Sequence, residues 1–113
     1  MSERRFLVRW AEEAARDLEE IVGHVAADSP MNAKNLLTRL RSRVDALDVA
    51  PQRGRVVPEL ARFGIRSWRE LIVKPHRIIY RVAEKEVHVL AIFDGRRDLE
   101  DVLLERLLRS RER

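Results

Sequence analysis

The chain has 113 residues, no cysteine, and 23 lysines and arginines against 19 aspartates and glutamates, which gives a net charge of +4. This length suits a single domain over residues 1–113 with enough core to fold alone, and the lack of cysteine excludes disulfide frameworks and thiolate metal sites and favours the cytoplasm. No segment has the apolar length of a membrane span, and the first residues lack the apolar middle region of a signal peptide.

The first part of the chain predicts a strand followed by a helix. Residues 5–10 have the character of a strand, and its period of two puts Phe6, Val8 and Trp10 on one face. A helix should follow at once, because apolar residues recur every three or four positions, namely Trp10, Ala14, Leu18, Ile21 and Val25.

A second helix is expected directly after the first. Ser29 is its predicted N-cap, and Pro30 takes the first helical position, where a missing amide hydrogen removes no hydrogen bond. Its buried face should comprise Ala33, Leu36, Leu37, Leu40, Val44 and Leu47. Ala50–Pro51 should end this helix, because proline disfavours helical geometry in the preceding residue. Two helices joined by so short a turn form a hairpin, and its apolar face needs a flat partner.

The second half of the chain predicts that partner, a sheet. A loop at 52–66 with a short extended piece precedes strands at 68–73, 77–82 and 87–93, and the short turns between these strands indicate antiparallel neighbours. A last helix should run from Asp98, its predicted N-cap, to about Leu108. The predicted fold is α+β, a helical hairpin packed on a small, mostly antiparallel sheet in the order β-α-α-β-β-β-α.

The excess positive charge lies in the predicted sheet. Residues 62–97 contain nine lysines and arginines against four acidic residues, whereas residues 1–61 contain ten of each. A guanidinium presents a planar fork of donors that matches phosphate or carboxylate. We therefore expect an outward basic face that binds an acidic target, formed by Arg69, Arg77, Arg81, Arg96 and Arg97. The alternative is that Glu70 neutralises Arg77 or Arg81 across the sheet.

Few residues are candidates for proton transfer, and no catalytic residue is assigned. Tyr80 lies two positions after Ile78 in a predicted strand, so both side chains should point to the same face. We therefore expect Tyr80 in the core, with its hydroxyl hydrogen-bonded at an edge. His76 lies in a predicted turn, where a solvated histidine is commoner than an acid or base. His24 and His88 lack ligand-type neighbours at metal spacing, so no metal or cofactor is expected.

Four short segments of the chain carry a family resemblance: Gly54–Leu60, Arg69–Val73, Arg77–Val82 and Gly95–Leu99. They resemble the RelE/ParE superfamily of toxins of type II toxin-antitoxin systems, most of all its ParE and plasmid-stabilisation branch. The resemblance covers residues 6–108 and implies the fold given above. It also implies a protein that arrests bacterial growth and is neutralised by a cognate antitoxin. RelE-like members cut mRNA in the ribosome, whereas ParE-like members are known for poisoning DNA gyrase.

The resemblance favours the ParE-like activity, in which the chain catalyses no reaction and binds gyrase or its DNA complex. RelE-like nucleases use basic residues that Arg69, Arg77 and Arg97 match. However, Leu71 replaces a second basic residue, and Leu103 stands about where a C-terminal tyrosine would be. Metal-free cleavage of RNA needs groups that transfer protons. A ribosome-dependent endoribonuclease is therefore the alternative, together with a non-toxic homologue that only helps an antitoxin repress their promoter.

The last helix indicates a protein partner. Leu104 and Leu108 lie partly off the line of its other leucines, and either a second chain or the core covers them. In toxins that this chain resembles, the C-terminal segment of the antitoxin folds around the toxin as helix and strand. We expect that segment to contact Leu104 and Leu108 and to place acidic residues on Arg77 and Arg81. The resemblance implies a heterotetramer or a larger complex.

Overall fold

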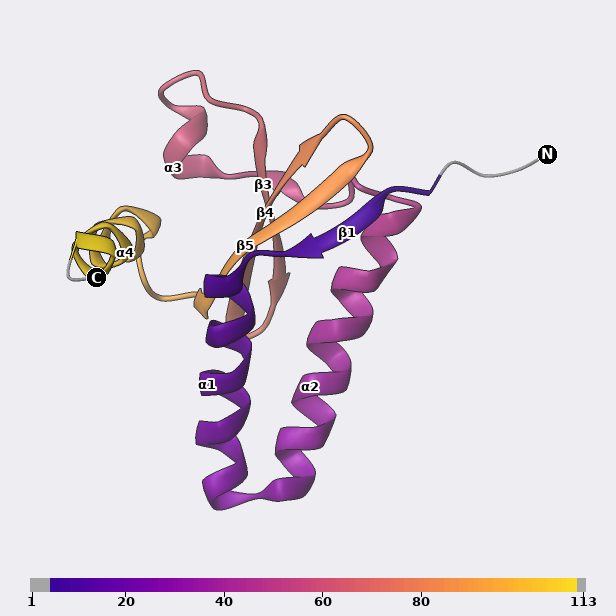
Figure 1. The fold of residues 1–113 in the computed structure, drawn as a ribbon, viewed down its shortest axis with the longest axis vertical. Coiled ribbons are helices and arrows are strands. Elements are labelled where there is room, and N and C mark those ends of the chain that lie inside the picture. The colour runs from indigo at the N-terminus through magenta and orange to yellow at the C-terminus, as the bar shows by residue number, and fades with distance from the viewer. Residues whose placement is uncertain (1–4, 112–113) are drawn as a thin grey trace.

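The computed structural model describes residues 5–111, with their side chains as far as residue 108. Its centre is a five-stranded sheet in the order β1-β5-β4-β3-β2 (Figure 1). The strands are β1 (Leu7–Trp10), β2 (Arg55–Val56), β3 (Trp68–Val73), β4 (His76–Ala83) and β5 (Glu86–Asp94). β1 runs parallel to β5, and the other neighbouring pairs are antiparallel. The predicted α+β class with a mostly antiparallel sheet is confirmed.

Two helices, α1 (Glu12–Asp28) and α2 (Pro30–Asp45), form the predicted hairpin. The turn between them is short because Ser29 has an extended backbone and its Oγ accepts a hydrogen bond from the Asn32 amide at 3.2 Å. Pro30 follows at the first helical position. The predicted N-cap and the predicted place of the proline are both confirmed.

The hairpin covers one face of the sheet and encloses the larger core (Figure 1). The helix residues in this core are those that the apolar spacing predicted, and Ala14 and Leu40 are fully buried. Phe6, Val8 and Trp10 pack against the same core, which confirms the predicted face of the first strand. The strands contribute Leu71, Val73, Ile78, Tyr80, Val87, Val89 and Ile92.

Two local features differ from the predictions. α2 ends at Asp45, and a 3-10 helix at Ala46–Asp48 follows, so the chain leaves α-helical geometry well before Pro51. The predicted loop contains a short helix, α3 (Pro58–Ala61). The fixed φ of proline suits the first position of this helix. The carbonyl of Val57 accepts hydrogen bonds from the amides of Leu60 and Ala61.

The other face of the sheet is covered by α3 and by α4 (Leu99–Arg111). A smaller core of buried side chains lies there: Val57, Ile79, Ala91, Phe93, Leu99 and Val102. An irregular register between β4 and β5 lets Ala91 face this core while Val89 faces the hairpin. Within the described residues, no helix combines the length and apolar character needed to cross a membrane.

Tyr80 connects the sheet to the segment that leads into β2. Its side chain is fully buried, its hydroxyl donates to the Pro51 carbonyl at 2.8 Å, and the hydroxyl accepts from the Gly54 amide at 2.9 Å. A Cβ atom at Gly54 would lie 2.6 Å from the Tyr80 hydroxyl, so only glycine fits beside it. The sequence expectation of a core tyrosine with a bonded hydroxyl is confirmed.

Replacing Tyr80 with phenylalanine should destabilise the protein by about 1–3 kcal/mol, because it leaves a buried carbonyl and a buried amide without partners. Urea unfolding followed by circular dichroism measures this change. Ser42→Ala is the control, since it removes an exposed hydroxyl that bonds only to the Arg39 carbonyl, and it should change stability by less than about 0.5 kcal/mol. Equal stabilities of the two variants would contradict the role given to Tyr80.

Candidate functional site

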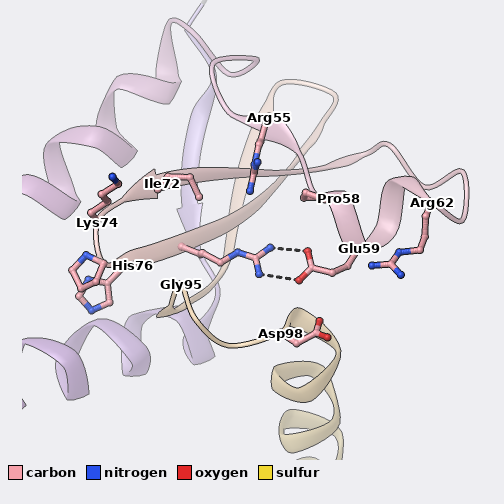
Figure 2. A pocket seen from close by; sticks show the side chains of 11 residues that line it. Arg55, Pro58, Glu59, Arg62, Ile72, Lys74, His76, Gly95 and Asp98 are labelled. Carbon is pink, nitrogen blue, oxygen red and sulfur yellow. Dashed lines mark hydrogen bonds and ion pairs between the residues drawn. The ribbon is translucent and has the colours of Figure 1, made fainter.

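A groove opens on the second face of the sheet, between α3, the β3–β4 turn and the loop from β5 to α4 (Figure 2). Its volume is about 490 Å³. The Gly95 amide donates to the Pro75 carbonyl at 2.7 Å, and this bond holds the β5–α4 loop against the β3–β4 turn. The groove has a basic lining, to which four cations contribute: Arg55, Arg62, Lys74 and Arg77.

Arg77 lies at the base of this groove and is only 7% exposed. Its Nη1 and Nη2 donate to the two carboxylate oxygens of Glu59, each at 2.8 Å (Figure 2), and its Nε donates to Glu70 at 2.6 Å. The guanidinium carbon also lies 5.1 Å from the centre of the Phe93 ring. Two carboxylates and an aromatic face therefore replace the water that the buried cation has lost.

Glu59 connects three elements of the site. It lies on α3, binds Arg77 of β4, and accepts a hydrogen bond from the Leu99 amide at the first turn of α4 at 3.0 Å. Hydrogen bonds from Arg77 lower the pKa of Glu59 from 4.5 to about 2. The same bonds raise the pKa of Arg77, so both groups are charged at neutral pH. α3 and the start of α4 are thus fixed to the sheet through one ion cluster.

The expectation that Arg77 belongs to an outward basic face is wrong. Strand parity correctly places it on the face opposite the hairpin, but α3 and α4 cover that face. A guanidinium buried there must be neutralised, and Glu59 and Glu70 do so. The alternative, in which Glu70 pairs with Arg77 across the sheet, is confirmed. The second partner of Glu70 is Arg55, at 2.6 Å, and not Arg81.

Arg69 and Arg81 lie on opposite faces of the sheet, as their pairing with Tyr80 and Trp68 requires. Arg69 is half-buried, and its Nη1 donates to the Gly54 carbonyl at 2.7 Å, so it supports the backbone before β2. Arg81 is exposed and forms no ion pair with any residue that the structure describes. Of these two arginines, only Arg81 keeps its charge free for a partner.

Arg96 and Arg97 lie in the exposed loop between β5 and α4. The Arg96 side chain is 91% exposed and binds Asp94 at 2.9 Å, and this pair lowers the pKa of Asp94 to about 2. Arg97 is 39% exposed and pairs with Glu105 of α4. Both guanidinium groups therefore reach solvent while contacting a carboxylate of their own chain.

The predicted N-cap of the last helix agrees with the structure. Asp98 Oδ1 accepts a hydrogen bond from the Glu100 amide at 3.2 Å.

Groups that transfer protons do not gather in the groove. His76 lines it, but burial lowers the pKa of His76, with Arg39 adding to this effect and Asp94 opposing it, and its Nδ1 has no partner among the described residues. Tyr80 belongs to the opposite core. The described residues contain no cluster of histidine, aspartate or glutamate suited to a metal ion.

α4 carries an exposed apolar surface. Among the α4 residues whose side chains the structure describes, Leu99 and Val102 in the first turns are the buried ones. Arg106 holds the helix to the rest of the fold, because it pairs with Asp17 of α1 and donates to the Leu90 carbonyl at 3.0 Å. The exposed leucines are Leu103 (38%), Leu104 (55%), Leu107 (63%) and Leu108 (53%). The two leucines predicted to contact another chain are thus accessible.

Sequence reasoning missed two residues that shape this site. Glu59 lies in one of the segments that carry the resemblance. Nothing in the sequence spacing indicates that it pairs with Arg77, 18 positions away. The sequence indicated Asp17 only as a negative charge near the start of a helix. In the structure its carboxylate accepts hydrogen bonds from the Ile92 amide and from the Arg106 guanidinium. Both pairings join elements that are distant in the chain, so local periodicity carried no signal for them.

The chain is similar to several known proteins. Residues 8–99 match the family described as ParE toxin of the type II toxin-antitoxin system parDE. Toxin RelE2 of Caulobacter vibrioides is 34% identical over 86 residues, which covers 75% of this chain and 90% of that protein. Y4kP of Sinorhizobium fredii is 32% identical over 105 residues, which covers 91% of this chain and 100% of that protein.

Two solved structures have the same fold. The chromosomal ParDE toxin-antitoxin system from P. aeruginosa aligns with a TM-score of 0.65 at 24% identity, over 80% of this chain and 97% of that chain. The toxin-antitoxin complex RelBE2 from Mycobacterium tuberculosis aligns with a TM-score of 0.58 at 19% identity, over 82% of this chain and 94% of that chain. This chain therefore shares its arrangement of helical hairpin and sheet with these two structures.

Replacing Glu59 with glutamine should make stability less dependent on pH. A carboxyl whose pKa falls from 4.5 to about 2 on folding stabilises the native state fully above about pH 5, and this contribution is lost as the pH falls toward 2. In Glu59→Gln, the free energy of unfolding should be lower at pH 7, and its slope in acid should decrease by up to about 1.4 kcal/mol per pH unit, the value for one proton.

Urea unfolding at a series of pH values measures both quantities. Glu19→Gln is the matched control, because it removes a carboxylate from an exposed position on α1, away from the groove. A Glu59→Gln protein with wild-type stability at pH 7 and the wild-type acid slope would show that the ion cluster does not hold the groove together.

Proposed function

The chain belongs to the ParE toxin family of type II toxin-antitoxin systems, within the ParE/RelE superfamily, and we propose that it arrests bacterial growth by binding DNA gyrase or the gyrase–DNA complex without breaking a covalent bond itself. Its action then rests on differential affinity for one state of the target. The cytoplasm, where gyrase works, is the proposed compartment.

One observation carries the choice of gyrase over RNA: the cation at the centre of the groove is neutralised, and no acid–base pair from residues 5–108 faces it. Arg77 is buried between Glu59 and Glu70, so it has little capacity left to stabilise a developing phosphate charge. His76 has a lowered pKa, and Tyr80 lies in the core on the other side of the sheet. Cleavage by a 2′-hydroxyl needs both a charge stabiliser and proton transfer.

The proposed contacts with the target are the outward cations. Arg81 is exposed without a described partner, and Arg96 and Arg97 are exposed in the β5–α4 loop. The pairs that Arg96 and Arg97 form with Asp94 and Glu105 are at the surface, where solvent screens the charges and the net stabilisation is small. An acidic surface or a phosphate backbone on the target would therefore replace these carboxylates at little cost in free energy.

A cognate antitoxin is the second proposed partner. The exposed leucines of α4 include Leu104 and Leu108, and an antitoxin segment with apolar residues would cover them. Acidic residues on that segment would pair with Arg81, whose exposed charge makes the association sensitive to salt. The heterotetramer or larger complex implied by the resemblance is part of this proposal.

A second candidate is ribosome-dependent cleavage of mRNA. The identity of 34% with a protein named toxin RelE2 favours it, as does the match of Arg69 and Arg97 to the basic positions of RelE-like nucleases. Leu103, which stands about where those nucleases carry a tyrosine, is 38% exposed and has no proton to give. The gyrase proposal therefore ranks first.

Replacing Arg96 and Arg97 together with alanine should relieve the growth arrest that the wild-type chain causes when it is induced without an antitoxin. In the purified protein the same change should weaken inhibition of gyrase supercoiling, because two outward cations are removed. The melting temperature should change little, because both ion pairs that are lost lie at the surface and are screened by solvent. Growth curves, a supercoiling assay and thermal unfolding measure the three effects.

The control for this double variant is Lys34→Ala with Arg41→Ala, which removes two exposed cations from α2. If both double variants arrest growth as the wild type does, the loop from β5 to α4 has no part in toxicity. Codon-specific cleavage of ribosome-bound mRNA in a primer-extension assay would make RNA the target. A culture that grows normally on induction of the wild type would point to the non-toxic homologue.

Replacing Leu104 and Leu108 together with alanine should weaken binding of the cognate antitoxin roughly tenfold to 100-fold, because apolar surface that the partner would cover is lost. Isothermal titration calorimetry with the purified antitoxin measures this change. Met31→Ala is the control, because Met31 is 73% exposed on α2, at the far end of the helical hairpin. Unchanged affinity in the double variant would place the antitoxin on another surface.

A further inference from the structure

The segment between α3 and β3 forms a projecting tip with an unusual surface. It reads Arg62-Phe63-Gly64-Ile65-Arg66 and extends beyond α3 at the edge of the molecule (Figure 1). Phe63 is 70% exposed and Ile65 is 42% exposed. Phe63 and Ile65 lie outside both described cores, so the tip presents exposed apolar surface beside its arginines.

The backbone holds this tip in a fixed shape. The Gly64 amide donates to the Ala61 carbonyl at 2.9 Å, and the Ile65 amide donates to the Leu60 carbonyl at 3.1 Å. Gly64 adopts a φ of 79°, and this pattern is the Schellman motif that ends a helix. Phe63 occupies the last position before the glycine, so it is presented to solvent by an ordered turn. Because the backbone is already ordered, it loses little conformational entropy when a ligand covers the side chain.

The charge around Phe63 has one sign. Residues 60–69 contain three arginines and no acidic residue. Arg62 and Arg66 are exposed, and neither guanidinium forms a hydrogen bond or an ion pair with a residue in the described part of the chain. Arg55, Arg96 and Arg97, in contrast, each contact a carboxylate. The two arginines that flank the ring are thus free to bind anions.

The basic surface continues from the tip into the groove. Arg62 stands at one end of the groove and Lys74 at the other, with Arg55 between them along the upper rim in the view of Figure 2. The lining also contains two carboxylates, of which Glu59 binds Arg77 at the base of the groove and Asp98 accepts a hydrogen bond from the Glu100 amide. A chain of negative charges that starts at the tip would therefore meet further cations along the groove.

From these features we infer that the tip at residues 62–66 binds unpaired nucleic acid, with one base stacked on Phe63 and the adjacent phosphates held by Arg62 and Arg66. Proteins that bind single strands combine an aromatic stacking platform with cations that follow the backbone, and every base offers a π-face. A purely apolar protein groove would accept the ring but leave the two flanking arginines uncompensated. This inference goes beyond the proposed action on gyrase and does not depend on it.

Fluorescence anisotropy of the full chain with a short labelled oligo(dT), an oligo(U) and a duplex of the same length tests the inference. The single strands should bind more tightly than the duplex, and the comparison of the two oligonucleotides decides between DNA and RNA. Phe63→Ala should weaken binding to the single strands roughly tenfold, and Phe63→Trp should retain it, because tryptophan preserves the stacking face.

Met31→Ala is the matched control, since Met31 is 73% exposed and lies in the first turn of α2, away from the tip. It should leave binding to the single strands unchanged. Arg62→Gln with Arg66→Gln should lower the slope of log affinity against log salt concentration by about 1.4, the value for two phosphate contacts on a single strand. Circular dichroism and thermal unfolding confirm that each variant is folded.

Three results would overturn the inference. Phe63→Ala with wild-type affinity for both single strands would remove the ring from nucleic-acid binding. Binding of the duplex as tight as that of the single strands, with no effect of Phe63→Ala, would reduce the tip to a general basic surface. Loss of affinity for the antitoxin or for vesicles of anionic phospholipid in Phe63→Ala, with oligonucleotide binding unchanged, would assign the tip to a protein or a membrane.

Discussion

The buried ion cluster of Arg77, Glu59 and Glu70 is the interaction on which the rest of the structure depends. A guanidinium at 7% exposure is tolerated only when carboxylates replace its lost hydration. Glu70 comes from the neighbouring strand, so the sheet supplies half of this compensation. Glu59 comes from α3 and also binds the Leu99 amide, so the other half fixes α3 and α4 over the second face. Removing either carboxylate would leave a buried charge without a full set of partners.

This cluster also decides where the positive charge of the protein can act. Arg77 is withdrawn from the surface, and Arg69 supports the backbone at Gly54. The free or weakly held cations lie at the margins of the molecule, at Arg81, at the β5–α4 loop and at the tip of residues 62–66. A surface of this kind suits binding to acidic or phosphate-rich partners better than bond cleavage, which needs a stabilised charge and a proton donor in one place.

Exposed apolar residues fall into two regions with different surroundings. The leucines of α4 lie beside acidic and basic side chains of the same helix, including Glu105. Phe63 lies between two arginines, and the nearest acidic residue in the chain, Glu59, binds Arg77. The first surface fits an amphipathic protein segment, which the antitoxin would supply, and the second fits a stacked base with flanking phosphates. In the two proposals made above, neutralisation and contact with nucleic acid take place on separate surfaces of the chain.

The sequence by itself determined the elements of the fold, the helical hairpin with its Ser29–Pro30 turn, the three central strands and the core position of Tyr80. These features follow from apolar periodicity and from the local preferences of serine and proline, which act over a few residues. Only the tertiary structure decided that α3 and α4 cover the second face and that Arg77 is consequently buried. Strand parity gives the face on which a side chain lies, but it cannot show what packs on that face. Glu59 reaches Arg77 from 18 positions away, so that pairing exists only once the chain has folded.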